Sequence, residues 1–183
     1  MSKRTKNMAL TAVMAALICA AGPLTIPVGP IPLTLANFMI FLSGAVLGAK
    51  QGAIATAIYL LIGGIGMPVF SGFSGGIHRL IGVTGGFLLA YVPCAFIAGL
   101  GTQAGETRPR HCWRLPACIV LGAAVLYAFG TVWFIVYKTW LLRSPTGLAE
   151  ALAVCVIPFL LGDAIKIAVT TLLAWPIRRA LYR

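Results

Sequence analysis

The stretch 158-PFLLGDAIKIAVTTLLAWP-176 decides how this chain folds. Its side chains are nearly all apolar, and its length is close to the ~20 residues that a helix needs to cross a bilayer. Yet it contains a carboxylate, Asp163, and an ammonium group, Lys166, three residues apart. That spacing places both groups on one face of a helix, close enough to pair. The stretch is therefore predicted to be a membrane helix that carries a charged pair.

The rest of the chain is equally apolar. Of its 183 residues, 60% are hydrophobic and 9% are charged, whereas soluble domains carry about 25% charged residues. This composition predicts an all-α, polytopic membrane protein that forms a single membrane-embedded domain over residues 1–183. The six predicted transmembrane segments are 8–22, 33–49, 51–67, 84–101, 115–137 and 149–177. We expect Pro158 to kink the last of them.

The first predicted segment has a second interpretation. Three cations, Lys3, Arg4 and Lys6, precede an apolar run, as in a signal peptide. No clean small-x-small cleavage site leads into a soluble domain, which favours an uncleaved first helix.

The positions of the cations predict the orientation of the segments. The net charge is +11, and only Arg79, Lys138 and Arg143 fall on the side opposite the N-terminus. Ten cations fall on the N-terminal side: Lys3, Arg4, Lys6, Lys50, Arg108, Arg110, Arg114, Arg178, Arg179 and Arg183. The positive-inside rule then predicts that both termini are cytoplasmic. The cations form no patch interleaved with aromatic residues, so we expect no nucleic-acid partner.

A charged pair in a membrane helix is costly. An unpaired charge at the centre of the bilayer costs about 2.5–3.5 kcal/mol on insertion scales, and two apolar residues would avoid that cost. Asp163 and Lys166 are therefore expected either to face a polar ligand site or to fix helix packing as a buried pair.

A second unusual stretch is 63-GGIGMPVFSGFSGGIHRLIGVTGG-86, which holds nine of the 21 glycines. Glycine at this density ends helices and allows the backbone to approach a bound molecule. The stretch includes Arg79 and is predicted to cap a cavity on the outer side. A flexible outer loop is the alternative.

Several classes of function lack their signatures. The chain has no GxxxxGK[ST] motif, which disfavours an ATPase. Asp163 is the one acid in a predicted segment interior, and five cysteines without CxxC spacing predict neither a metal site nor disulfides. An intramembrane enzyme that uses Asp163 as acid or base remains an alternative.

The first segment carries alanines at helical spacing, at Ala12, Ala16 and Ala20. Such stripes of small residues let another helix approach closely. Both a partner interface and internal packing are open at this point.

Together, the alanine stripe and four motifs resemble the BioY family. The motifs are 29-GPIPLTL-35, 66-GMPVFSG-72, 82-GVTGGF-87 and 162-GDAIK-166. BioY is the biotin-specific substrate-capture (S) component of energy-coupling factor (ECF) transporters. The resemblance implies six helices with cytoplasmic termini in the bacterial cytoplasmic membrane, and a biotin site near the outer face. It implies no enzymatic activity and no cofactor. The implied partners are a membrane-embedded coupling protein, contacted by Ala12, Ala16 and Ala20, and a cytoplasmic ATPase pair.

The chemistry of biotin suggests roles for particular residues. Asp163 can accept from a ureido N–H, and Lys166 can donate to the ureido oxygen. Arg79 or loop amides can bind the valerate carboxylate, although the two ends of the ligand could be reversed. The remaining predicted binding residues are Phe70, Phe73, Phe87, Tyr91, Thr34 and Asn37. An S component for another small vitamin is a further alternative.

Overall fold

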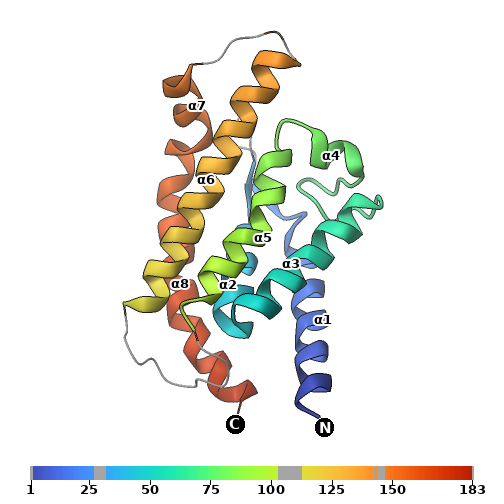
Figure 1. Cartoon of the computed structure of the whole chain (residues 1–183), viewed down its shortest axis with the longest axis vertical. Coiled ribbons are helices and arrows are strands. Elements are labelled where there is room, and N and C mark those ends of the chain that lie inside the picture. Colours follow the sequence, from blue (N-terminus) through green and yellow to red (C-terminus); the bar gives the residue numbers. More distant parts are fainter. Residues whose placement is uncertain (1, 27–31, 103–112, 142, 144–146, 183) are drawn as a thin grey trace.

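The computed structural model describes residues 2–26, 32–102, 113–141, 143 and 147–182 (Figure 1). The chain is mostly helical, which confirms the all-α prediction. Its elements are α1 (Lys3–Ala21), β1 (Thr25–Ile26), β2 (Leu33–Thr34), α2 (Ala36–Leu47), α3 (Ala49–Gly64), α4 (Ile77–Ile81), α5 (Gly85–Gly99), α6 (Arg114–Trp140), α7 (Leu148–Cys155) and α8 (Ile157–Leu181).

Each predicted segment contains a helix, but the last one is divided. It breaks at Val156, whose φ of −122° and ψ of −57° separate α7 from α8. Pro158 lies in the first turn of α8, where its missing N–H costs no helical hydrogen bond. The proline therefore begins a helix and does not kink one.

Two small features were not predicted. The strands β1 and β2 pair antiparallel, with Thr25 opposite Thr34 and Ile26 opposite Leu33. The glycine-rich stretch contains the five-residue helix α4.

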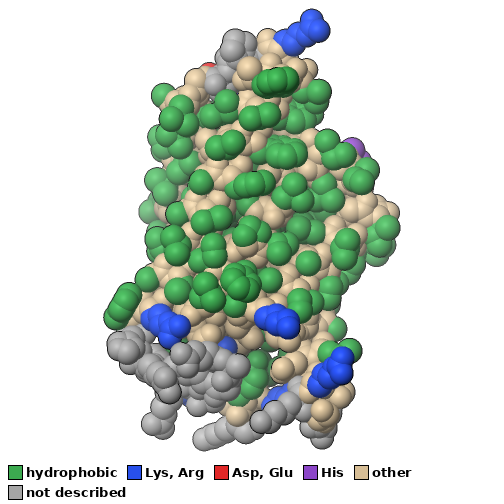
Figure 2. Space-filling model, in the orientation of Figure 1, with side chains coloured by type: hydrophobic (Ala, Val, Ile, Leu, Met, Phe, Trp, Pro, Cys, Tyr) green, Lys and Arg blue, Asp and Glu red, His purple; other side chains and the backbone are tan. Residues whose placement is uncertain are grey.

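By length and composition, α6 and α8 are the described helices that pass as candidate membrane spans. The shorter helices α2 and α5 are also apolar. Hydrophobic side chains cover most of the face shown in Figure 2. This outward apolar surface is typical of a protein that lies in lipid.

Helix α5 packs against α2, α3 and α6 through small residues. A Cβ at Gly44 of α2 would collide with the backbone of Ala95 and Gly99 in α5. On α6, a Cβ at Gly122 would lie 2.9 Å from the Cys94 carbonyl oxygen. These glycines let the helices approach closely, as small residues do in membrane bundles.

Both described ends of the chain lie at one end of the molecule (Figure 1). There the Tyr182 ring lies 5.6 Å from Lys6 Nζ and 5.3 Å from Arg178 Cζ. Arg178 is buried, and its Nη1 donates to the Val46 carbonyl at 2.6 Å and to Thr102 Oγ1 at 3.3 Å. The guanidinium therefore satisfies a carbonyl at the C-terminus of α2, where a cation is favourable.

Candidate binding site

The ion pair expected from the sequence is formed on α8. Lys166 Nζ lies 2.8 Å from Asp163 Oδ1, and both side chains are nearly buried. One helical face therefore carries both charges, as the i, i+3 spacing indicates.

Two further groups complete this pair. Tyr127 of α6 donates its hydroxyl to Asp163 Oδ2 at 2.6 Å, and Lys166 donates to the Thr34 carbonyl at 3.0 Å. Each charge thus has a second partner, which offsets part of its desolvation. Tyr127 is not among the binding residues predicted from the sequence. A tyrosine within an apolar span needs a partner for its hydroxyl, and this was the available signal.

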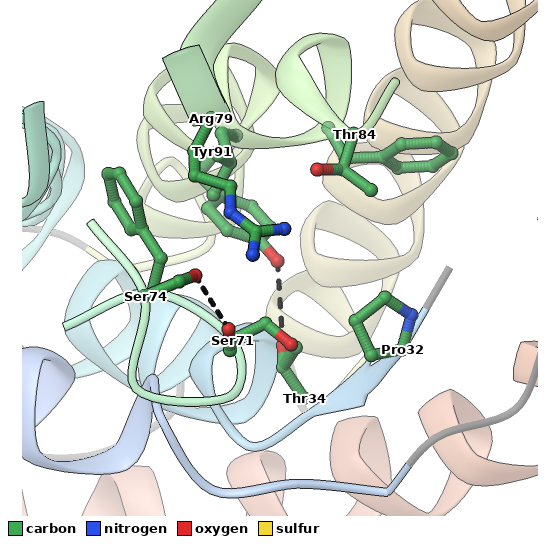
Figure 3. Close-up of a pocket in the computed structure, with 10 residues that line it drawn as sticks. Pro32, Thr34, Ser71, Ser74, Arg79, Thr84 and Tyr91 are labelled. Carbon is green, nitrogen blue, oxygen red and sulfur yellow. Dashed lines mark hydrogen bonds between the residues drawn. The ribbon is translucent and has the colours of Figure 1, made fainter. Parts of the chain in front are cut away.

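A chain of polar groups continues from β2 to α5. Thr34 Oγ1 donates to Asn37 Oδ1 at 3.3 Å and lies 3.5 Å from Tyr91 Oη (Figure 3). The hydrogen bonds therefore bring together five residues that the sequence analysis proposed, from three different parts of the chain: Thr34, Asn37, Tyr91, Asp163 and Lys166.

An outer cavity lies beside these groups, with about 540 Å³ of empty space, part of it open to solvent. Ser71, Ser74 and the Arg79 guanidinium approach the same space as Thr34 and Tyr91 (Figure 3). Ser74 Oγ donates to the Ser71 carbonyl at 2.7 Å. The lining residues are Pro32, Thr34, Phe70, Ser71, Ser74, Arg79, Thr84, Phe87, Leu88 and Tyr91.

A second cavity, which we call the inner cavity because Tyr127 lines it, has about 310 Å³ of empty space, part of it open to solvent. Its lining residues are Pro32, Asn37, Phe87, Tyr91, Leu126, Tyr127, Cys155 and Phe159. Pro32, Phe87 and Tyr91 line both cavities, so an elongated molecule could contact the two spaces at once. Asp163 and Lys166 are not among the described lining residues of either; they lie behind Tyr127 and Thr34.

The outer cavity includes three more residues that the sequence analysis proposed: Arg79, Phe70 and Phe87. Phe70 packs its ring edge-on against Tyr59 at 5.5 Å. Phe73 is different, because it is 70% exposed and is not among the described residues that line either cavity. The structure does not bring Phe73 to the other candidates.

The alanine stripe, which is predicted to contact a partner protein, lies on the outside of the bundle. Ala12, Ala16 and Ala20 are exposed, whereas Ala15 and Ile18 of the same helix are buried. Among the described residues, no group of three His, Cys, Asp or Glu side chains could hold a metal ion.

The model of the BioY family matches residues 1–183. The chain belongs to the BioY family. The family assignment confirms the resemblance on which the sequence analysis relied. BioY proteins are transporter components and not enzymes, so the alternative of an intramembrane enzyme is set aside.

Similar proteins extend over most of this BioY chain. A probable biotin transporter BioY of Pyrococcus horikoshii is 35% identical over 171 residues, which cover 93% of this chain and 95% of that protein. The biotin transporter BioY of Thermotoga maritima is 36% identical over 167 residues, which cover 91% of this chain and 92% of that protein. The crystal structure of the S-component for biotin from an ECF-type ABC transporter superposes with a TM-score of 0.83 at 27% identity, covering 100% of both chains.

Proposed function

We propose that this protein binds biotin with high affinity and takes it up across the cytoplasmic membrane as the S component of an ECF-type transporter. The observation that carries the proposal is the match to a solved biotin S-component over the full length of both chains. The cavities beside a buried polar network supply a physical basis for capturing a small polar molecule. Separate coupling and ATPase subunits would supply the energy, since this chain has no nucleotide-binding motif.

The proposed topology has six membrane spans, with both termini in the cytoplasm of a bacterium. In the one embedded domain, α7 and α8 together would form the last span. The charge distribution supports this orientation. Lys and Arg side chains gather near the end of the molecule where the chain begins and ends (Figures 1 and 2).

For the site, we propose that the ureido ring occupies the inner cavity and that the valerate carboxylate lies near Arg79. Lys166 has three N–H donors, of which Asp163 and the Thr34 carbonyl take two. The third would reach a ligand oxygen where the bound ligand displaces Tyr127 or Thr34, because Lys166 is not among the described residues that line either cavity. Arg79 lies beside Ser71 and Ser74 in the outer cavity (Figure 3), and a guanidinium is a strong carboxylate partner.

The function is tested by equilibrium binding of labelled biotin to the purified, detergent-solubilised chain, with riboflavin and thiamine as competitors. We expect tight binding that unlabelled biotin alone displaces. Displacement by riboflavin or thiamine would assign the chain to another vitamin. Absence of binding by folded protein would contradict the proposal.

The orientation of the ligand is tested by Arg79→Gln. If Arg79 binds the carboxylate, the variant loses about tenfold in affinity for biotin and almost none for biotin methyl ester. His78→Gln, the neighbouring exposed residue, is the matched control. An equal loss for biotin and its ester would favour the reversed orientation.

A further inference from the structure

The segment that covers the outer cavity presents an apolar outer surface. We call residues 65–84, between α3 and α5, the cap segment. Ile65 is 83% exposed and Phe73 70% exposed, and the other apolar side chains of this surface are each more than half exposed. The exposed set is Ile65, Met67, Phe73, Ile77 and Ile81.

The small polar side chains of the cap segment face the other way. Ser71, Ser74 and Thr84 line the outer cavity. In a water-exposed loop, polar side chains face outward. Here three small polar side chains face the cavity and five apolar side chains face outward, while Val69 and Phe70 are buried. His78 and Arg79 are exposed and border a shallow pocket next to Thr84. Apolar side chains with a cation at their edge, here Arg79, are typical of a segment in the membrane interface.

Most backbone amides in the first half of the cap segment are bonded within the protein. Amides that donate to backbone carbonyls belong to Ile65, Gly66, Met67, Val69, Phe70, Gly72, Ser74 and Gly76. Pro68 has no N–H to satisfy. Irregular backbone is tolerated at membrane depth when its polar groups are bonded within the protein, and this segment meets that condition over most of its first half.

The cap segment does not extend as far as the C-terminal end of α6. Trp133 of α6 donates its indole N–H to the Gly82 carbonyl at 3.0 Å. Trp133 precedes the last residue of α6, Trp140, by seven residues, or about 10 Å along the helix. Figure 1 shows α6 extending well past α4. The apolar surface is also continuous with α3, where Leu61 is exposed one turn before Ile65.

The backbone conformation of Phe73 also favours a lipid contact. Its φ of +56° is in the left-handed region, which non-glycine residues rarely adopt and which costs about 1–3 kcal/mol when strained. This conformation holds an aromatic ring outward at the tip of the turn closed by the Phe70–Ser74 bridge. In water, such an arrangement exposes a large apolar side chain with no gain. In lipid, the ring would be buried.

We propose that the cap segment lies in the membrane interface, with Ile65, Met67, Phe73, Ile77 and Ile81 in contact with lipid acyl chains. The inference rests on the membrane placement in the proposed function. The occupant of this surface is lipid, because the surface is continuous with the lipid-facing side of α3. The cap segment then has the protein on one side and the bilayer on the other.

The test uses the full chain in liposomes of phosphatidylcholine with brominated acyl chains, which quench tryptophan on contact. Tryptophan is introduced as Phe73→Trp and, separately, as Ile77→Trp, and the emission of the unmodified chain is subtracted. We expect brominated lipid to remove roughly half of the added emission in both variants. Biotin binding in the same samples reports whether each variant is folded and tests the transport proposal separately.

Two controls bracket the result. Phe129→Trp on the exposed face of α6 should be quenched strongly, and Glu150→Trp at the exposed start of α7 should be quenched weakly. Quenching at positions 73 and 77 as weak as at 150, with strong quenching at 129, would overturn the inference. Weak quenching at 129 would overturn the membrane placement, and the inference with it, whether or not biotin binds.

Discussion

Among single residues, Asp163 has the most demanding environment. It is 2% exposed, and its two oxygens accept from Lys166 and Tyr127. A buried ion pair of this kind is weak evidence for stability, because desolvation offsets most of the attraction. The cost is easier to explain if the pair holds Tyr127 and Thr34 in position, since Tyr127 lines the inner cavity and Thr34 lines the outer one.

We expect Asp163→Asn to weaken biotin binding by at least about tenfold and to destabilise the fold by about 3–5 kcal/mol. The substitution leaves the Lys166 ammonium buried without its counter-charge. Equilibrium binding and thermal unfolding of the purified chain measure the two effects. Glu150→Gln is the control, since its ion pair with Lys138 is 3.7 Å long and exposed and contributes about 0–1 kcal/mol. Unchanged biotin affinity in Asp163→Asn would contradict the role given to this carboxylate.

Tyr127→Phe isolates the other hydrogen bond of the carboxylate. Removing a hydroxyl that donates to a charged group should cost about 1.5–3 kcal/mol of stability. Because Tyr127 lines the inner cavity, biotin affinity should fall with it, as measured by the same binding assay. Tyr137→Phe, on the same helix but remote from both cavities, should leave affinity unchanged. Equal effects of the two substitutions would argue against a positioning role for Tyr127.

The sequence predicts the part of the site that depends on local spacing. Asp163 and Lys166 are three residues apart on one helix, so helical periodicity is sufficient to pair them. Tyr127 is 36 residues from Asp163, and its role depends on how α6 packs against α8. The Thr34 group that meets Lys166 is a backbone carbonyl, and no side-chain pattern signals it.

For helices and strands, apolar runs predict where helices lie but not how they begin and end. The last predicted segment divides at Val156, because Pro158 suits the first turn of α8 better than a helix interior. Phe73 is one of the residues that the sequence predicts at the binding site. Its positive φ turns the ring outward, and the backbone conformation at one residue is not visible in the apolar pattern.

The contact between α5 and α6 should set the width of the cavities. A Cβ at Gly130 of α6 would overlap the ring of Phe87, and Phe87 lines both cavities. Gly130→Ala should therefore push this ring into the binding space, weaken biotin binding by about tenfold and cost about 1–3 kcal/mol of stability. Gly147→Ala, where a Cβ meets no atom within 4 Å, is the control for the assay. Wild-type affinity in Gly130→Ala would show that the ring has room to move elsewhere.

On the scale of the whole molecule, the biotin site and the contact with the coupling protein are proposed to lie on separate surfaces. The cavities are lined from β2, the cap segment, α2 and the helices α5 to α8, whereas the alanine stripe is exposed on α1. Thr11 of α1 donates to Gln51 Oε1 on α3 at 2.9 Å, so the opposite face of α1 is already packed inside the bundle. The exposed face is therefore the one available to another protein.

If the coupling protein packs on this stripe, Ala16→Trp should block the close approach that small residues allow. We expect the variant to bind biotin with unchanged affinity, because Ala16 is exposed and remote from the cavities. Complex formation with the coupling protein and biotin uptake into cells should both fall by about tenfold or more. Ala124→Trp, an exposed alanine on α6, controls for the bulk of an added indole in the lipid-facing surface. Loss of biotin binding together with uptake would instead indicate that Ala16 supports the fold, and unchanged uptake would remove the stripe from the proposed interface.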